Sequence, residues 1–172
     1  MHDALRFVMC ALLVGAIATA FMDIVAVFRK RLSNVPAADY GLVGRWLAYL
    51  AHGRFRHNSI AAAPPVRGEL VIGWSAHYLV GTVFAALLLA IWGIDWICRP
   101  TIGPALIVGA GSVVAPYFIM QPGMGLGIAA SRTPHPVTAR IRSLIAHTIF
   151  GTGLYVAGLV TSFIAARQWT LC

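Results

Sequence analysis

The composition of this chain is typical of a membrane protein. Of its 172 residues, 59% are apolar and only 10% are charged, whereas about a quarter of the residues in soluble domains are charged. The formal net charge of +8 would suggest nucleic acid as the partner of a soluble protein. Here the basic residues fall between apolar stretches, where they orient the chain and meet anionic head groups. We therefore expect membrane lipids as partners and no nucleic acid.

Four stretches are apolar enough and long enough to cross the hydrocarbon core of a bilayer, which takes about 20 helical residues. They predict a single all-α membrane domain over residues 1–172, built as a four-helix transmembrane bundle. The expected spans are residues 4–28, 70–97, 102–120 and 141–166. The two connections at 29–69 and 121–140 would then lie on the same side of the membrane.

Loop charge predicts the orientation. Ten Lys and Arg residues fall in 29–69 and 121–142, against three in the rest of the chain. Positive charge favours the cytoplasmic side, so both termini are expected outside the inner membrane of a bacterium. Ala18-Thr19-Ala20 resembles a signal-peptide cleavage site. However, the apolar run continues to Phe28 and stops at three basic residues, which favours a retained first span.

The first cytoplasmic connection contains an amphipathic pattern over residues 39–50. Its apolar residues share one face of a helix: Leu42, Val43, Trp46, Leu47 and Leu50. Gly41, Gly44, Arg45 and Ala48 share the other face. This predicts a short helix at the membrane interface, with packing against the bundle ends as the alternative. The basic-aromatic run at residues 54–58 favours head-group contact over phosphate binding. The residues expected to contact lipid or a partner are Trp46, Arg45, Arg54 and Arg56.

The second cytoplasmic connection begins with a Gly-rich, apolar run over residues 121–130. It predicts either a helix continued past a kink at Pro122 or irregular backbone that dips back into the bilayer. The alternating glycines do not follow a strand, so they are only a weak signal for phosphate binding.

The three cysteines, Cys10, Cys98 and Cys172, are scattered and contain no Cys-x-x-Cys pair. This spacing argues against a thiolate metal cluster. It favours free buried thiols over a Cys98–Cys172 disulfide.

Ionisable residues inside a membrane are costly and therefore indicate function. Asp23, His77 and His147 lie within expected spans, and Gln121 ends the third span. At a rise of about 1.5 Å per residue, the three ionisable side chains are about 8–12 Å from the cytoplasmic boundary. Each helix is thus expected to present one polar group to a common layer.

Two of the spans share a short motif. The matching segments are Ala76-His77-x3-Gly81-Thr82 and Ala146-His147-x3-Gly151-Thr152. With a weaker match between Met22-Asp23 and Met120-Gln121, this pattern predicts two hairpins in parallel orientation, as in some transporters. Gly73, Gly81 and Gly151 each stand four residues from a histidine, a spacing at which small residues allow close helix packing.

The leading functional hypothesis is a metal or haem site formed by His77, His147, Asp23 and Gln121. Imidazole and carboxylate groups suit zinc, iron or copper, and glycine four residues after each histidine leaves room for a flat ring. The structural alternative is that each histidine only bonds a neighbouring backbone or hydroxyl group.

Two further hypotheses use other properties of the same chain. In one, Asp23 and the histidines relay protons in a small-solute or ion transporter, which would need a homodimer to form a path. In the other, residues 40–58 dock a non-catalytic subunit or assembly factor onto a larger membrane complex. An enzyme is least favoured, because no nucleophile and base can be paired from the sequence.

Several segments resemble a family of uncharacterised bacterial inner-membrane proteins, catalogued as a domain of unknown function. The segments that carry the resemblance are Tyr40–Trp46, Ser59–Pro64, His77–Leu79, Met120–Gly125 and Ala130–Pro134. The resemblance covers nearly the whole chain. It implies a four-helix membrane fold and no assigned activity.

Overall fold

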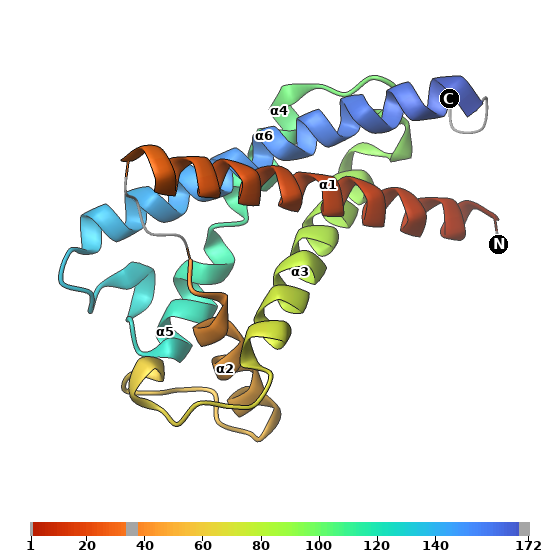
Figure 1. Cartoon of the computed structure of the whole chain (residues 1–172). Coiled ribbons are helices and arrows are strands. Elements are labelled where there is room, and N and C mark those ends of the chain that lie inside the picture. The colour runs from red at the N-terminus through yellow and green to blue at the C-terminus, as the bar shows by residue number, and fades with distance from the viewer. Residues whose placement is uncertain (1, 34–37, 169–172) are drawn as a thin grey trace.

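The computed structural model describes residues 2–33 and 38–168, and every regular element in these ranges is a helix (Figure 1). The α-helices are α1 (His2–Ser33), α2 (Tyr40–Ala51), α3 (Glu69–Trp92), α4 (Ile102–Gly111), α5 (Gln121–Met124) and α6 (Pro136–Gln168). Short turns connect them: η1 (Ile60–Ala62), η2 (Ile94–Cys98), the π-helical η3 (Pro116–Met120) and η4 (Ile128–Ala130).

Four helical segments are long and apolar enough to span a membrane, which confirms the predicted number. They are Asp3–Ser33, Glu69–Trp92, Ile102–Met124 and Pro136–Ile164. The second segment ends five residues before the expected residue 97. Gly93 adopts φ +82 there and stops the α-helix, and the chain continues as the tighter turn η2.

The long helices cross one another and bury a core of small and aliphatic side chains. α1 contacts both α3 and α6, and α4 contacts α6. Figure 1 shows α3 crossing α1 at a steep angle and leading away from it. Val14 and Ala18 of α1, Leu88 of α3 and Leu154 of α6 are fully buried where these helices meet.

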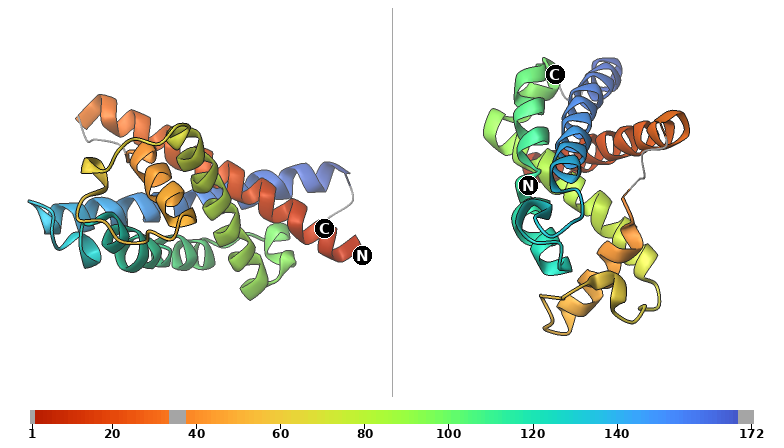
Figure 2. Two further views of the ribbon diagram at one scale, coloured as in Figure 1. Left: turned by 90° about the horizontal axis from the view of Figure 1, so that it is seen from below. Right: turned by 90° about the vertical axis from the view of Figure 1, so that its left-hand side faces the viewer.

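The two connections predicted to be cytoplasmic form a second, smaller unit. In Figure 1 and the right view of Figure 2, most of α2 and the loop after it lie apart from α1, α4 and α6, with α3 leading to them. Only the start of α2 reaches α1, through Tyr40. Trp46 of α2, Ile60 of η1 and Met124 of α5 form a separate buried cluster. The two connections, which are separated in the sequence by α3 and α4, therefore pack against each other.

The third span is not one regular helix. After α4 the helix is interrupted at residues 112–113, continues through the π-helical turn η3, and ends as α5 at Met124. Pro116 and Pro122 have no N–H to donate, which weakens the hydrogen-bond ladder around them. Gly125, at φ +92, ends α5 after Met124. Of the two alternatives for residues 121–130, the kinked helix describes the segment as far as Met124.

The helix predicted within the first connection is present as α2, and it packs against α3. Asp39 caps it by accepting hydrogen bonds from the N–H groups of Gly41 and Leu42, at 2.9 and 3.3 Å. The face that contains Gly41, Gly44 and Arg45 is buried against α3. The glycines let the backbones of α2 and α3 approach closely. The face of α2 that carries them is therefore covered by α3.

Cys10 is a buried free thiol. The Cys98–Cys172 pairing involves Cys172, which lies outside the described residues.

Candidate functional site

Three polar side chains meet where α1, α2 and α3 come together. Asp23 lies in α1, His77 in α3, and Tyr40 is the first residue of α2. The His77 Nε2 atom is 3.0 Å from Asp23 Oδ1 and 3.0 Å from the Tyr40 hydroxyl oxygen. The Tyr40 hydroxyl is 3.5 Å from the same Asp23 oxygen. We call this group the Asp23 cluster.

The Asp23 cluster is mostly shielded from solvent. The side chains of His77 and Asp23 are 13% and 18% exposed, and the Oδ2 atom of Asp23 is buried with no hydrogen-bond partner in the described part of the chain. The Tyr40 ring lies 4.3 Å from the imidazole and 4.5 Å from the Trp74 ring, centroid to centroid. Aromatic rings thus cover the polar atoms on one side.

Tyr40 stays protonated in this setting. Burial raises the pKa of its hydroxyl, and the neighbouring Asp23 carboxylate raises that pKa further. The hydroxyl therefore has a proton to donate, either to His77 Nε2 or to Asp23.

Two hydrogen-bond arrangements fit the same positions of the heavy atoms. If Nε2 carries a proton, His77 donates to Asp23 Oδ1. If Nε2 is unprotonated, Tyr40 donates to it instead. A protonated imidazole donates in the first way, and a neutral imidazole with its proton on Nδ1 accepts in the second, so proton uptake needs no movement of a side chain.

Close approach of backbones positions the three residues. A methyl group on Gly73 would overlap the Tyr40 carbonyl, and one on Gly44 would overlap the Glu69 carbonyl. Because Gly44 and Gly73 touch, Tyr40 at the start of α2 lies beside Gly73, one helical turn before His77 in α3. The sequence shows only that Tyr40 directly follows Asp39, which caps α2. Its contact with His77 depends on how α2 docks on α3.

His147 belongs to a different hydrogen-bonded group. Its Nδ1 atom is 2.6 Å from the Ser112 hydroxyl, which in turn donates to the Gly109 carbonyl at 2.6 Å. Since a carbonyl can only accept and the hydroxyl has one proton, His147 must donate from Nδ1. The two histidines therefore bond different partners, in agreement with the structural alternative for His147.

Gln121 is buried at the start of α5, and its side-chain oxygen has no partner among the described residues. Its backbone carbonyl accepts from Leu126 and helps to close the turn after α5. α5 packs with α2 and the turns around it. The expected common layer of four polar groups is thus reduced to the contact between Asp23 and His77, with Tyr40 added.

The two matched glycines mark helix contacts of the same kind. Gly81 lies against Gly15 and Thr19 of α1, whereas Gly151 lies against Ala105 and Gly109 of α4. Each glycine lies where two long helices come closest, one turn after its histidine. Duplication of the two hairpins stays a prediction.

A pocket of about 230 Å³ opens beside the Asp23 cluster. Its lining residues are Met22, Asp23, Ala26, Arg29, Ala38, Tyr40, Ala139, Arg142, Ser143 and Ala146. One carboxylate and two guanidinium groups thus share the same small space. Arg29 comes from the end of α1 and Arg142 from the start of α6, where the sequence places basic residues at the ends of spans.

The residues expected at lipid head groups have varied surroundings. Arg45 is buried and forms a two-pronged ion pair with Glu69, with both N–O distances 2.8 Å. Trp46 is also buried and donates to the Phe55 carbonyl at 2.9 Å. Arg54 lies over the Tyr49 ring at 5.7 Å, and Arg56 lines a second pocket. Arg45 differs from the expectation because the close contact of α2 with α3 brings it to Glu69.

A metal site needs several ligands around one point. No group of three His, Cys, Asp or Glu side chains suitable for a metal ion occurs within residues 3–33 and 38–164.

These features define an all-helical protein with four apolar helices of membrane-spanning length and a polar cluster where α1, α2 and α3 meet. Residues 12–161 match the family described as protein of unknown function (DUF2938), and the chain belongs to that family. This confirms the predicted membership in an uncharacterised family. Comparison with curated proteins gave no match, and neither did comparison with solved structures.

Proposed function

We propose that this membrane protein binds a small anionic solute beside Asp23 and couples the binding to uptake of a proton by the Asp23 cluster. The observation that carries the proposal is the pocket shared by Asp23 and Tyr40 with Arg29 and Arg142. Guanidinium groups bind carboxylates and phosphates through two parallel hydrogen bonds. This is the chemistry of a proton-coupled solute transporter.

The coupling follows from charge. An ionised Asp23 repels an anion in the pocket that its own side chain lines. Two unit charges about 4 Å apart near a protein surface interact by about 4 kcal/mol, so one proton can change the affinity for an anion by tenfold or more. Proton uptake makes the Asp23 cluster less negative, and binding therefore strengthens as the pH falls.

The geometry of the cluster supports its role as the proton carrier. Both protonation states keep the same heavy-atom positions, because either His77 or Tyr40 supplies the proton of the central hydrogen bond. Either ring nitrogen of an imidazole can hold or release a proton, so His77 is the group of this cluster that can accept it. Asp23 and Tyr40 line the pocket, so a solute bound there lies beside the group that takes up this proton.

Binding can be measured through Trp74, whose ring is tilted against that of Tyr40 with 4.5 Å between the ring centroids. The protein in lipid nanodiscs is titrated with acetate, succinate or inorganic phosphate, each at about pH 5.5 and about pH 8. Trp74→Phe identifies the part of the fluorescence change that arises at this site. At least one anion is expected to bind more tightly at the lower pH by about tenfold. Uptake into proteoliposomes under a pH gradient then tests transport.

Four variants separate the parts of the mechanism. Arg142→Gln is expected to weaken binding about tenfold at both pH values. Asp23→Asn tightens binding at about pH 8 because the repelling charge is gone, and His77→Gln removes the pH dependence in this range. Asp95→Asn, which removes a carboxylate from the exposed turn η2, leaves binding unchanged. The absence of binding by all three anions, or binding that Arg142→Gln does not alter, would overturn the proposal.

The metal and haem hypothesis for the same residues is tested on the same preparation. The contacts favour the anion proposal, because His77 bonds Asp23 and Tyr40 whereas His147 bonds Ser112. A haem absorption band, or a stoichiometric metal lost in both His77→Ala and His147→Ala, would instead assign the two histidines to one cofactor.

A further inference from the structure

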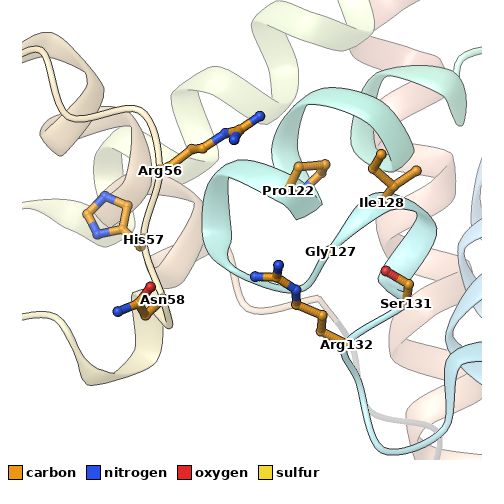
Figure 3. A pocket seen from close by; sticks show the side chains of 8 residues that line it. All are labelled: Arg56, His57, Asn58, Pro122, Gly127, Ile128, Ser131 and Arg132. Carbon is orange, nitrogen blue, oxygen red and sulfur yellow. The ribbon is translucent and has the colours of Figure 1, made fainter.

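A second pocket, of about 400 Å³, lies between the segment after α2 and the loop after α5 (Figure 3). Its lining residues are Arg56, His57, Asn58, Pro122, Gly127, Ile128, Ser131 and Arg132. Figure 3 shows the side chains of Arg56 and Arg132 extending from opposite segments into the space between them. Both segments belong to the connections predicted to face the cytoplasm.

Backbone contacts hold the two walls of this pocket in place. The N–H of His57 donates to the Gly123 carbonyl at 2.9 Å, and the N–H of Arg132 donates to the Leu126 carbonyl at 2.9 Å. Gly125, in a left-handed conformation, lies so close to the Asn58 carbonyl that a methyl group would overlap it. The two arginines are therefore attached to a fixed frame and not to independent loops.

The turn that presents Arg132 is strained. Ala129 and Ala130 adopt φ +47 and +58, in a region that costs a residue with a β-carbon about 1–2 kcal/mol. Hydrogen bonds stabilise this turn: Arg140 Nε donates to the Ala129 carbonyl and Thr133 Oγ1 to the Ala130 carbonyl, both at 2.8 Å. The strained turn places Ser131 and Arg132 at the pocket, and strain of this kind tends to occur at functional sites.

Among the described residues, no Asp or Glu side chain lines this pocket to balance its two positive charges. The chain contains only five acidic residues, and none lies in residues 54–58 or 122–132. Glu69 is bonded to Arg45, Asp23 to His77, and Asp39 to the first N–H groups of α2. The remaining two, Asp3 and Asp95, lie in the first turn of α1 and in η2. Both arginines are exposed to solvent, so an anion from solution can reach them and supply the counter-charge.

We propose that Arg56 and Arg132 bind a phosphate group in this pocket, with the Ser131 hydroxyl as a further donor. Two guanidinium forks from opposite sides suit a tetrahedral phosphate, which offers several oxygens to each. The pocket is large enough for a phosphate and a small ester group. The phosphate is carried either by the head group of an anionic phospholipid or by a soluble phosphate ester, and the site joins the two connections.

The test has a soluble arm and a lipid arm, both on the full chain. In the soluble arm, purified protein in neutral nanodiscs is titrated with inorganic phosphate and glycerol phosphate by calorimetry. In the lipid arm, native mass spectrometry counts phosphatidylglycerol molecules retained from mixed phosphatidylglycerol and phosphatidylcholine. Binding in the first arm assigns a soluble ester, and selective retention in the second assigns a lipid head group. The absence of both would overturn the proposal.

Matched variants show whether the pocket is responsible. Arg56→Gln and Arg132→Gln are each expected to weaken binding about tenfold. The double variant should weaken it further than either single one, because no guanidinium is then left in the pocket. Arg54→Gln removes the same charge from the same loop but not from the pocket, and should have little effect. Arg56→Lys keeps the charge and loses the fork, which provides a test if the Gln variants fold poorly. An equal loss of affinity in Arg54→Gln would show that the effect comes from the overall positive charge and not from the pocket, and would overturn the proposed site.

Discussion

At the level of single residues, the Arg45–Glu69 pair shows how a charge can serve the fold. The guanidinium donates through Nε and Nη2 to the two carboxylate oxygens at 2.8 Å. It also donates through Nη1 to the Ala63 carbonyl at 2.9 Å, while Glu69 accepts from the N–H of Val66 at 2.9 Å. Burial of this pair joins α2, the segment 60–66 and the start of α3. The ion pair with Glu69 also raises the pKa of Arg45, which stays charged.

Removal of either member of this pair is expected to lower the thermal midpoint of unfolding, because the partner loses its counter-charge. The double variant Arg45→Ala/Glu69→Ala should lose less than the sum of the two single variants. Arg54→Ala, an exposed arginine in the same connection, is the control and should change the midpoint less than either. Unfolding in detergent followed by circular dichroism measures all four. Additive losses would show that the two side chains act independently.

Sequence reasoning reached part of the candidate site at this scale. The cost of ionisable residues inside spans predicts Asp23 and His77 as site residues. The structure places His77 Nε2 3.0 Å from Asp23 Oδ1. The same argument does not predict Tyr40 as a site residue, because a tyrosine at the start of a helix outside the spans is not costly to bury. Its role depends on the docking of α2 against Gly73, which involves residues 33 positions apart.

At the level of elements, the contact between α1 and α3 depends on four small residues. Gly15 lies against Thr82, and Gly81 lies against Thr19. A methyl group added to Gly81 would overlap Thr19 Oγ1 but would remain 3.4 Å from Thr19 Cβ. The Thr19 hydroxyl is buried and has no hydrogen-bond partner within the described ranges. The obstacle to a side chain at position 81 is thus a single oxygen atom.

Gly81→Ala should therefore destabilise the protein by about 1–3 kcal/mol, the usual cost of overpacking. Thr19→Ala removes the oxygen and should be nearly neutral, because an unpaired buried hydroxyl contributes little. The double variant Thr19→Ala/Gly81→Ala is expected to regain most of the lost stability. The thermal midpoint of the three variants in the same detergent decides this, and failure of the second change to rescue the first would show that the helices are spaced differently.

The third span shows the same dependence of an element on its surroundings. Its prolines predicted a kink, but they did not predict the π-helical turn η3 or the end of α5 at Gly125. Where the kinked segment ends depends on the contact of Gly125 with Asn58 in the other connection.

At the level of the whole molecule, the two long connections pack into one unit at the start of α3 (Figure 1). Ten of the thirteen Lys and Arg residues lie in 29–69 and 121–142. Because positive loops stay in the cytoplasm, we propose that this unit and both candidate pockets face the cytoplasm.

Cysteine labelling of intact cells tests this orientation. Asp95→Cys, in the exposed turn η2, should react with a membrane-impermeant maleimide before lysis. His135→Cys, in the exposed loop before α6, should react only after lysis. The signal is the increase over the parent chain, which carries three cysteines. The reverse pattern would invert the orientation.

The sequence by itself determined the class of protein and its four apolar helices, because the length and polarity of a span are local properties of the chain. It also showed where charge is scarce and where it gathers. The tertiary structure decided which groups meet: Asp23 with His77 and Tyr40, His147 with Ser112, and Arg56 with Arg132 across one pocket. These contacts depend on how closely glycines allow helices and loops to approach, and that distance is set by packing between segments far apart in the chain.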